Sequence, residues 1–117
     1  MENHAKLSRK DFLDSLDGCA RLRPVWDAFA SQYDAIITPS TPDAAPEGIE
    51  YTGDARFCQC WSILHAPSLN VPGFIGQNGL PLGLTVVGPR YRDRHVLHAG
   101  AAIGDIFEKE GGFVSAI

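Results

Sequence analysis

The chain has 117 residues, of which 44% are hydrophobic and 21% are charged. This length suits one domain or one part of a larger domain, and the composition is that of a globular protein with a buried core. Its net charge of −4, from 10 Lys and Arg against 14 Asp and Glu, argues against nucleic acid as a direct ligand, because few cations are present to neutralise phosphates. No apolar run approaches the roughly 18 residues of a membrane helix, and residues 1–10 are polar. We therefore expect no membrane partner, no signal peptide and no anchor.

The cysteines are Cys19, Cys58 and Cys60. An odd number at these spacings does not match the disulfide framework of a small secreted protein. We therefore expect free thiols and a cytoplasmic location.

The first predicted element is a helix over residues 9–22, opened by a capping box of Ser8 and Asp11. Pro24 lacks an N–H and disfavours helical geometry at the residue before it. The apolar helical spacing nevertheless continues across it, at Leu22, Trp26, Phe29 and Tyr33. A kink or a restart is predicted at Pro24, and not the end of helicity.

Residues 34–38 are short, apolar and β-branched, which predicts a buried strand. Residues 38–52 contain three prolines and little periodicity, which indicates an extended surface loop. Helical periodicity resumes near Asp54, a good N-cap, and is expected to stop at Pro67. The apolar face of this helix would carry Phe57, Trp61 and Leu64.

Two strand-like runs, residues 68–75 and 80–87, flank Gln77-Asn78-Gly79 and predict an antiparallel hairpin. Residues 82–87 are almost continuously apolar, as expected for a strand covered on both faces.

A last helix is expected to begin at an Asp93 cap and to end before Gly111-Gly112. Its apolar face would carry Val96, Gly100, Ile103 and Phe107. The complete order is helix, strand, helix, strand, strand, helix. It predicts a mixed α/β fold with about three strands, including a hairpin, and about three helices.

The order of these motifs resembles the C-terminal part of the amidase signature family, over about residues 19–112. The blocks that carry the resemblance are Ala35 to Pro46 (AIITPSTPDAAP), Thr52 to Asp54 (TGD), Phe57 to Pro72 (FCQCWSILHAPSLNVP) and Gly79 to Pro89 (GLPLGLTVVGP). Members of this family cleave carbon–nitrogen bonds of amides, and their fold is a large mixed sheet between helical layers. The resemblance implies that residues 1–117 form a single piece of an amidase-type α/β/α sandwich that lacks the catalytic core.

The family's nucleophile is a serine activated through a second serine and a lysine, on a Gly/Ser-rich signature upstream of these blocks. This chain contains no such run. None of its serines lies in a G-x-S-x-G elbow, and the closest Ser–Lys pair, Ser8 with Lys10, is interpreted as a helix cap beside a solvated cation. No catalytic residue is therefore expected in this chain, which alone should be catalytically silent.

Two groups of residues are of metal-ligating types. Cys58 and Cys60, near His65, would point in directions about 200° apart on a helix and so could not share one ion. His95 and His98 share a helical face, but arginines flank them and two strong ligands are too few. Neither a metal nor a cofactor is expected, and both histidines are interpreted as solvated.

The resemblance places the helix that opens at Asp54 on the substrate side of the sheet. Asp54, Phe57, Cys58 and Trp61 are therefore candidate substrate-binding residues, and ordinary core packing is the alternative for Phe57 and Trp61. The resemblance implies that members acting on glutamine present a carboxylate near this helix start, where it holds the ammonium group of the substrate. Here Ala55 takes that place and Asp54 is adjacent, which argues against glutamine.

Three functions remain open on the sequence. The favoured one is the structural and substrate-pocket segment of an amidase-family hydrolase, which binds a small-molecule amide only together with the missing catalytic portion. The alternatives are a non-catalytic binding or assembly role, and part of a glutamine-dependent amidotransferase. Unpaired strand edges and uncovered apolar faces predict association, as a homo-oligomer or with the rest of the amidase.

Overall fold

The computed structural model describes residues 7–112 and contains six elements in the predicted order. They are α1 (Arg9–Ala30), β1 (Ile36–Pro39), α2 (Gln59–Leu64), β2 (Ser68–Ile75), β3 (Pro81–Val87) and α3 (Asp93–Lys109). The mixed α/β fold with a hairpin is confirmed.

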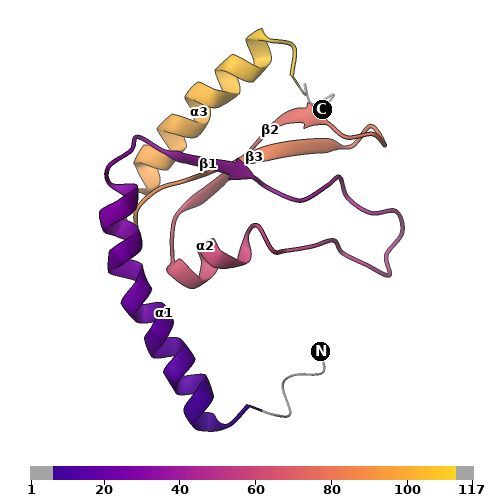
Figure 1. The fold of residues 1–117 in the computed structure, drawn as a ribbon. Coiled ribbons are helices and arrows are strands. Elements are labelled where there is room, and N and C mark those ends of the chain that lie inside the picture. Colours follow the sequence, from indigo (N-terminus) through magenta and orange to yellow (C-terminus); the bar gives the residue numbers. More distant parts are fainter. Residues whose placement is uncertain (1–6, 113–117) are drawn as a thin grey trace.

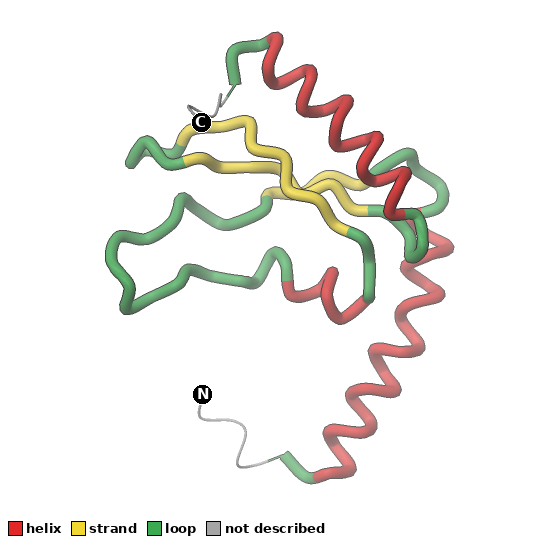
Figure 2. The backbone as a smooth tube through the Cα atoms, turned by 180° about the vertical axis from the view of Figure 1, so that it is seen from behind, coloured by secondary structure: helices red, strands yellow, loops and turns green. Residues whose placement is uncertain are grey.

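The three strands form one antiparallel sheet in the order β1-β3-β2. Figure 1 shows α3 on one side of this sheet, and α2 with the long loop between β1 and α2 on the other. The view from behind, in Figure 2, shows the same arrangement and the length of the green loop. The loop therefore lies across from the helix that closes the core.

The predicted hairpin joins β2 to β3 through a loop over residues 76–80. The Gly79 N–H donates to the Gly76 carbonyl at 2.9 Å, and the Gly76 N–H donates to the Leu80 carbonyl at 2.8 Å. The positive φ falls on Gly79, at 78°. This is the arrangement of a turn closed by a residue in the left-handed region, which glycine adopts at low cost.

One face of the sheet is apolar and packs under α3. Val71, Val86 and Val96 are buried there, and Leu69, Ile103 and Phe107 pack against them. Because side chains alternate along a strand, the residues between these point to the opposite face. That opposite face carries Ser68, Asn70 and Thr85.

The C-terminal end of β3 is buried from both sides, as predicted from its apolar run. Val86 and Val87, which point to opposite faces, are both 0% exposed. Beyond them the Trp26 indole donates to the Gly88 carbonyl at 3.2 Å. This bond ties α1 to the end of the strand.

A charged clamp fixes the same junction. Both the backbone N–H and the guanidinium of Arg90 donate to the Asp27 carboxylate, with guanidinium distances of 2.7 and 2.9 Å. The Arg90 hydrogen bonds hold the pKa of Asp27 below its ordinary value, and the carboxylate raises the pKa of Arg90.

The first helix begins as predicted but extends further. The Ser8–Asp11 capping box is present. The helix then continues through Pro24 to Ala30 as one element, without a restart. Pro24 is exposed, so water can reach the carbonyl that its missing N–H leaves without a helical donor. Continued helicity across Pro24 is therefore confirmed, whereas the predicted end of the first helix near residue 22 was wrong.

Two predicted helix starts were also wrong. The Asp54 carboxylate accepts the Arg56 N–H at 2.9 Å and pairs with the Arg56 guanidinium at 2.6 Å, which closes a local turn and leaves α2 to begin only at Gln59. In α3, Asp93 is the first helical residue and not the cap. Its negative charge still suits the helix N-terminus.

Candidate functional site

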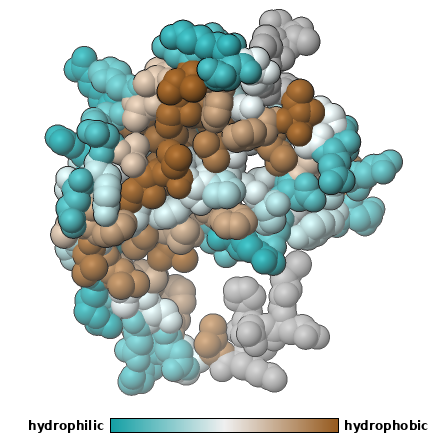
Figure 3. All heavy atoms as spheres, turned by 45° about the horizontal axis from the view of Figure 1, so that its top comes forward, coloured by the Kyte–Doolittle hydropathy of each residue, from teal (hydrophilic) through white to brown (hydrophobic). Residues whose placement is uncertain are grey.

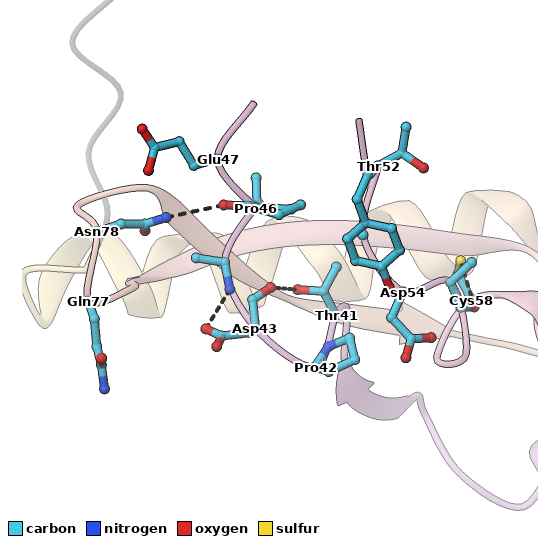
Figure 4. Close-up of a pocket in the computed structure, with 15 residues that line it drawn as sticks. Thr41, Pro42, Asp43, Pro46, Glu47, Thr52, Asp54, Cys58, Gln77 and Asn78 are labelled. Carbon is cyan, nitrogen blue, oxygen red and sulfur yellow. Dashed lines mark hydrogen bonds between the residues drawn. The ribbon is translucent and has the colours of Figure 1, made fainter. Parts of the chain in front are cut away.

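Two neighbouring cavities are formed by the described residues on the sheet face opposite α3. The larger of these lies inside the long loop and measures about 710 Å³. Its walls come from residues 41–47 and 51–55, with Cys58 and the hairpin residues Gln77 and Asn78. The Asn78 side-chain amide donates to the Ala45 carbonyl at 3.2 Å (Figure 4), which links the hairpin turn to the loop. This link closes one end of the cavity.

Short-range hydrogen bonds shape the loop around this cavity. The Thr41 hydroxyl donates to the Asp43 carbonyl at 2.7 Å, and the Ala44 N–H donates to the Asp43 carboxylate at 2.7 Å (Figure 4). Asp43, Glu47 and Asp54 contribute carboxylates to the lining, and no Lys or Arg does. The cavity wall is therefore acidic.

The smaller cavity, of about 410 Å³, lies against the polar face of the sheet. It is lined by Ser40, Thr41, Cys58, Trp61, Ser68, Asn70, Pro81, Leu82, Gly83 and Thr85. None of these residues is Asp, Glu, Lys, Arg or His. Thr41 and Cys58 line both cavities, so the two are neighbours.

A chain of hydrogen bonds at the floor of the smaller cavity joins β3 and β2 to Ser40, the residue that follows β1. The buried Thr85 hydroxyl donates to the Ser40 hydroxyl at 2.9 Å, and the Ser40 hydroxyl donates to the Asn70 side-chain carbonyl. We call Thr85, Ser40 and Asn70 the polar relay. The sequence reasoning missed it, although the alternation of polar and apolar residues over 68–71 was a signal.

Trp61 forms the side of the smaller cavity and packs on α1. Its ring centroid lies 5.1 Å from that of Trp26, and the Arg23 guanidinium donates to the Ile63 carbonyl of α2 at 3.1 Å. The Trp61 indole nitrogen is buried, with no hydrogen-bond partner among residues 7–112. An unpaired buried donor is unfavourable by roughly 1–3 kcal/mol.

Three of the four predicted binding residues line the cavities. Asp54 lines the larger cavity, Trp61 lines the smaller, and Cys58 lines both. Phe57 is half-buried and is not among the lining residues of either. The two cavities thus bring Asp54, Cys58 and Trp61 to one side of the sheet.

The cysteines Cys19, Cys58 and Cys60 are free thiols, and the last two are exposed. Among residues 7–112, no three His, Cys, Asp or Glu side chains are placed to hold a metal ion. His95 is not simply solvated, because its ring nitrogen lies 2.5 Å from the Asp34 carbonyl. No helix within the same range is long and apolar enough to cross a membrane.

Comparisons with known proteins show which proteins this chain is similar to. The A subunit of the glutamyl-tRNA(Gln) amidotransferase from Jannaschia sp. is 35% identical over 97 residues, which cover 76% of this chain and 19% of that protein. Its counterpart in Ruegeria pomeroyi is 33% identical over 98 residues, with the same shares. No family model matches the chain.

A solved structure extends the likeness to the fold. The crystal structure of the same amidotransferase component from Thermotoga maritima superposes with a TM-score of 0.60 at 28% identity, over 73% of this chain and 20% of that one. This chain is a relative of the amidase signature family. It matches the C-terminal part of these proteins and spans about a fifth of their length.

Proposed function

We propose that this chain is the C-terminal, substrate-pocket segment of an amidase-family protein that acts on carbon–nitrogen bonds of amides. The observation that carries the proposal is the meeting of two cavities at Cys58, on the sheet face opposite α3. In an α/β protein, a concave site bordered by loops at one side of the sheet is a common place for a small ligand. The similarity to the amidotransferase relatives is the basis for proposing that the substrate is an amide.

The roles of the candidate residues follow from their positions. Trp61 and Pro81 offer apolar surface to an acyl group, and Asp54, whose carboxylate is paired with Arg56, lies in the wall of the adjoining cavity. Cys58 lies between the two cavities. Its thiol is within 3.2 Å of the Ala55 carbonyl, a contact that holds it at the border.

The chain is proposed to be inactive alone. Nucleophilic attack on an amide requires an activated nucleophile, a base and donors for the oxyanion. The described lysines, Lys10 and Lys109, lie near the start of α1 and at the end of α3, and neither lines a cavity. The single piece 1–117 would therefore need a catalytic portion supplied by the rest of an amidase.

A reconstitution tests this proposal. The Jannaschia protein would be produced without its matched segment, and this chain would be added to it. We expect amide hydrolysis only in the mixture. The relative's own segment is the positive control, so restoration by that segment alone would count against the proposal. The proposed inactivity of the isolated chain would also be refuted if the chain hydrolysed an amide and one Ser→Ala substitution abolished that turnover.

Participation in a glutamine-dependent amidotransferase is a second candidate, because the Jannaschia and Ruegeria relatives carry that name. Ala55 argues against it, since a side chain without charge cannot pair with the ammonium of glutamine. The same reconstitution separates the two when glutamine is compared with simple aliphatic amides. Restored activity that prefers glutamine would favour the amidotransferase. A chain that restores no activity and yet associates would favour a purely binding or assembly role.

A further inference from the structure

The polar relay leaves one hydrogen-bond donor of the sheet without a partner. Asn70 accepts from Ser40 through its side-chain carbonyl oxygen, so its amide nitrogen is the free end. Among residues 7–112, the only hydrogen bond of the Asn70 side chain is the one from Ser40. Asn70 is an exposed residue that lines the smaller cavity.

Two neighbours fix the orientation of the Asn70 carboxamide. In the relay the Ser40 hydroxyl accepts from Thr85 and donates to the Asn70 carbonyl oxygen, so that oxygen faces Ser40. Gly83 leaves the space that the carboxamide fills, since a methyl group at position 83 would overlap the Asn70 oxygen. With the carbonyl oxygen facing Ser40, the amide nitrogen forms the other end of the carboxamide.

The rest of the cavity defines the group that this donor would meet. No charged side chain is among the lining residues, and the hydroxyl groups of Thr41 and Ser68 border the same space. A neutral wall with amide and hydroxyl donors suits an uncharged oxygen acceptor better than an ion, because an ion would lose hydration without gaining an opposite charge. Trp61 and Pro81 are the apolar residues that line this cavity on the same face of the sheet as Asn70.

We propose that Asn70 is a specificity-determining residue that donates from its side-chain amide to a carbonyl oxygen within the acyl part of a small neutral amide. The inference rests on the proposed function, since it names a substrate class for the same cavity. It would favour acyl groups that carry a second carbonyl over purely aliphatic ones.

Binding to the intact chain tests the inference without catalysis. Succinamide is the carbonyl-bearing probe, and pentanamide is its aliphatic control of similar length. In a titration followed by nuclear magnetic resonance, we expect succinamide to shift the Asn70 side-chain amide and the Trp61 indole signals in a saturable way. Pentanamide should bind at least about fivefold more weakly, the effect of one neutral hydrogen bond.

Substitutions at Asn70 identify the donor. Asn70→Leu removes it, and the nearly isosteric Asn70→Asp replaces it with an acceptor. Both should raise the dissociation constant of succinamide about fivefold or more. Gln59→Glu is the matched charge control, because Gln59 is exposed on α2 and lines neither cavity. This variant should bind succinamide with the affinity of the wild type.

Several results would overturn the inference: no saturable shift with succinamide, equal affinity for pentanamide, or wild-type affinity in a folded Asn70→Asp variant. The reconstitution assay reports on the catalytic role separately. Succinamide binding without restored hydrolysis would refute the proposed function and leave the site. Restored hydrolysis with equal preference for aliphatic amides would support the proposed function and refute the specificity role of Asn70.

Discussion

At the scale of single residues, Asp27 and Arg90 make the best-defined charged contact in the described chain. Their side chains are 28 and 21% exposed, and the carboxylate accepts from both the backbone and the guanidinium of Arg90. Such pairing is geometrically specific because the planar guanidinium matches the carboxylate. The pair holds the end of β3 against α1.

The lowered pKa of Asp27 makes this contact sensitive to acid. The carboxylate's contribution to stability is fully present above its unfolded pKa, about 3.8, and is lost as the pH falls through the lower folded pKa. Asp27→Asn should therefore be less stable than wild type at pH 7. In urea melts over pH 2–7, the two curves should converge below about pH 4. A difference that stays constant over this range would exclude the carboxylate as its source.

Trp61 also belongs to the scale of single residues. It lies between the smaller cavity and α1, and this position determines how much its substitution lowers the free energy of unfolding. It is only half-buried, against Trp26 of α1, so Trp61→Ala should lower the free energy of unfolding by about 2 kcal/mol, less than the roughly 3–5 kcal/mol of a fully buried Trp. Trp61→Phe, which keeps an aromatic ring, is the control and should recover most of the loss. A change below about 1 kcal/mol in denaturant melts would place Trp61 among ordinary surface residues.

At the scale of elements, α3 packs closely against β2. Gly100 is buried in the helix face that lies on the sheet, and a methyl group there would overlap the Leu69 side chain. At Gly104, one turn further along, a methyl group would come no nearer than 3.9 Å to Val71. The two glycines occupy the same helix and differ in the space beside them.

This difference gives a matched pair of substitutions. Gly104→Ala should stabilise the protein by up to about 1 kcal/mol, because alanine is the better helix former. Gly100→Ala gains the same propensity but must displace Leu69, and overpacking of this kind costs about 1–3 kcal/mol. Thermal melts should thus rank Gly104→Ala above Gly100→Ala. Equal stabilisation of the two variants would show that Leu69 moves aside freely.

At the scale of the whole molecule, the described surface is unusually apolar. Figure 3 shows apolar side chains, in brown, at the surface on the face that it views. On α1 the apolar residues are between 48 and 57% exposed at Phe12, Leu16, Leu22 and Phe29, and Ala30 is the one buried residue of that helix. Large exposed apolar patches mark surfaces that another protein part covers.

Association of the isolated chain is the expected consequence. We predict a dimer or a larger oligomer in sedimentation at micromolar concentration. Leu16→Lys combined with Leu22→Lys should shift the equilibrium toward monomer, because both side chains lie on the exposed apolar side of α1. Asp17→Lys adds a positive charge on the opposite side of the helix and serves as the control. If the wild-type chain sediments as a compact monomer, the exposed apolar surface of α1 does not drive association.

The sequence by itself determined the features that depend on neighbours along the chain. The capping box at Ser8, the turn at Gly79 and the face of α3 through Val96 and Gly100 follow from short-range spacing, so they were predictable. The element order and the kinship with the amidase signature family came from the same local motifs.

Only the tertiary structure decided the features that depend on distant parts of the chain. The polar relay joins residues 30 and 45 positions apart, and no local periodicity encodes that meeting. Pro24 could remain inside α1 because exposed backbone there can be hydrated, while packing of Trp26 and Ala30 beyond it favours continued helix.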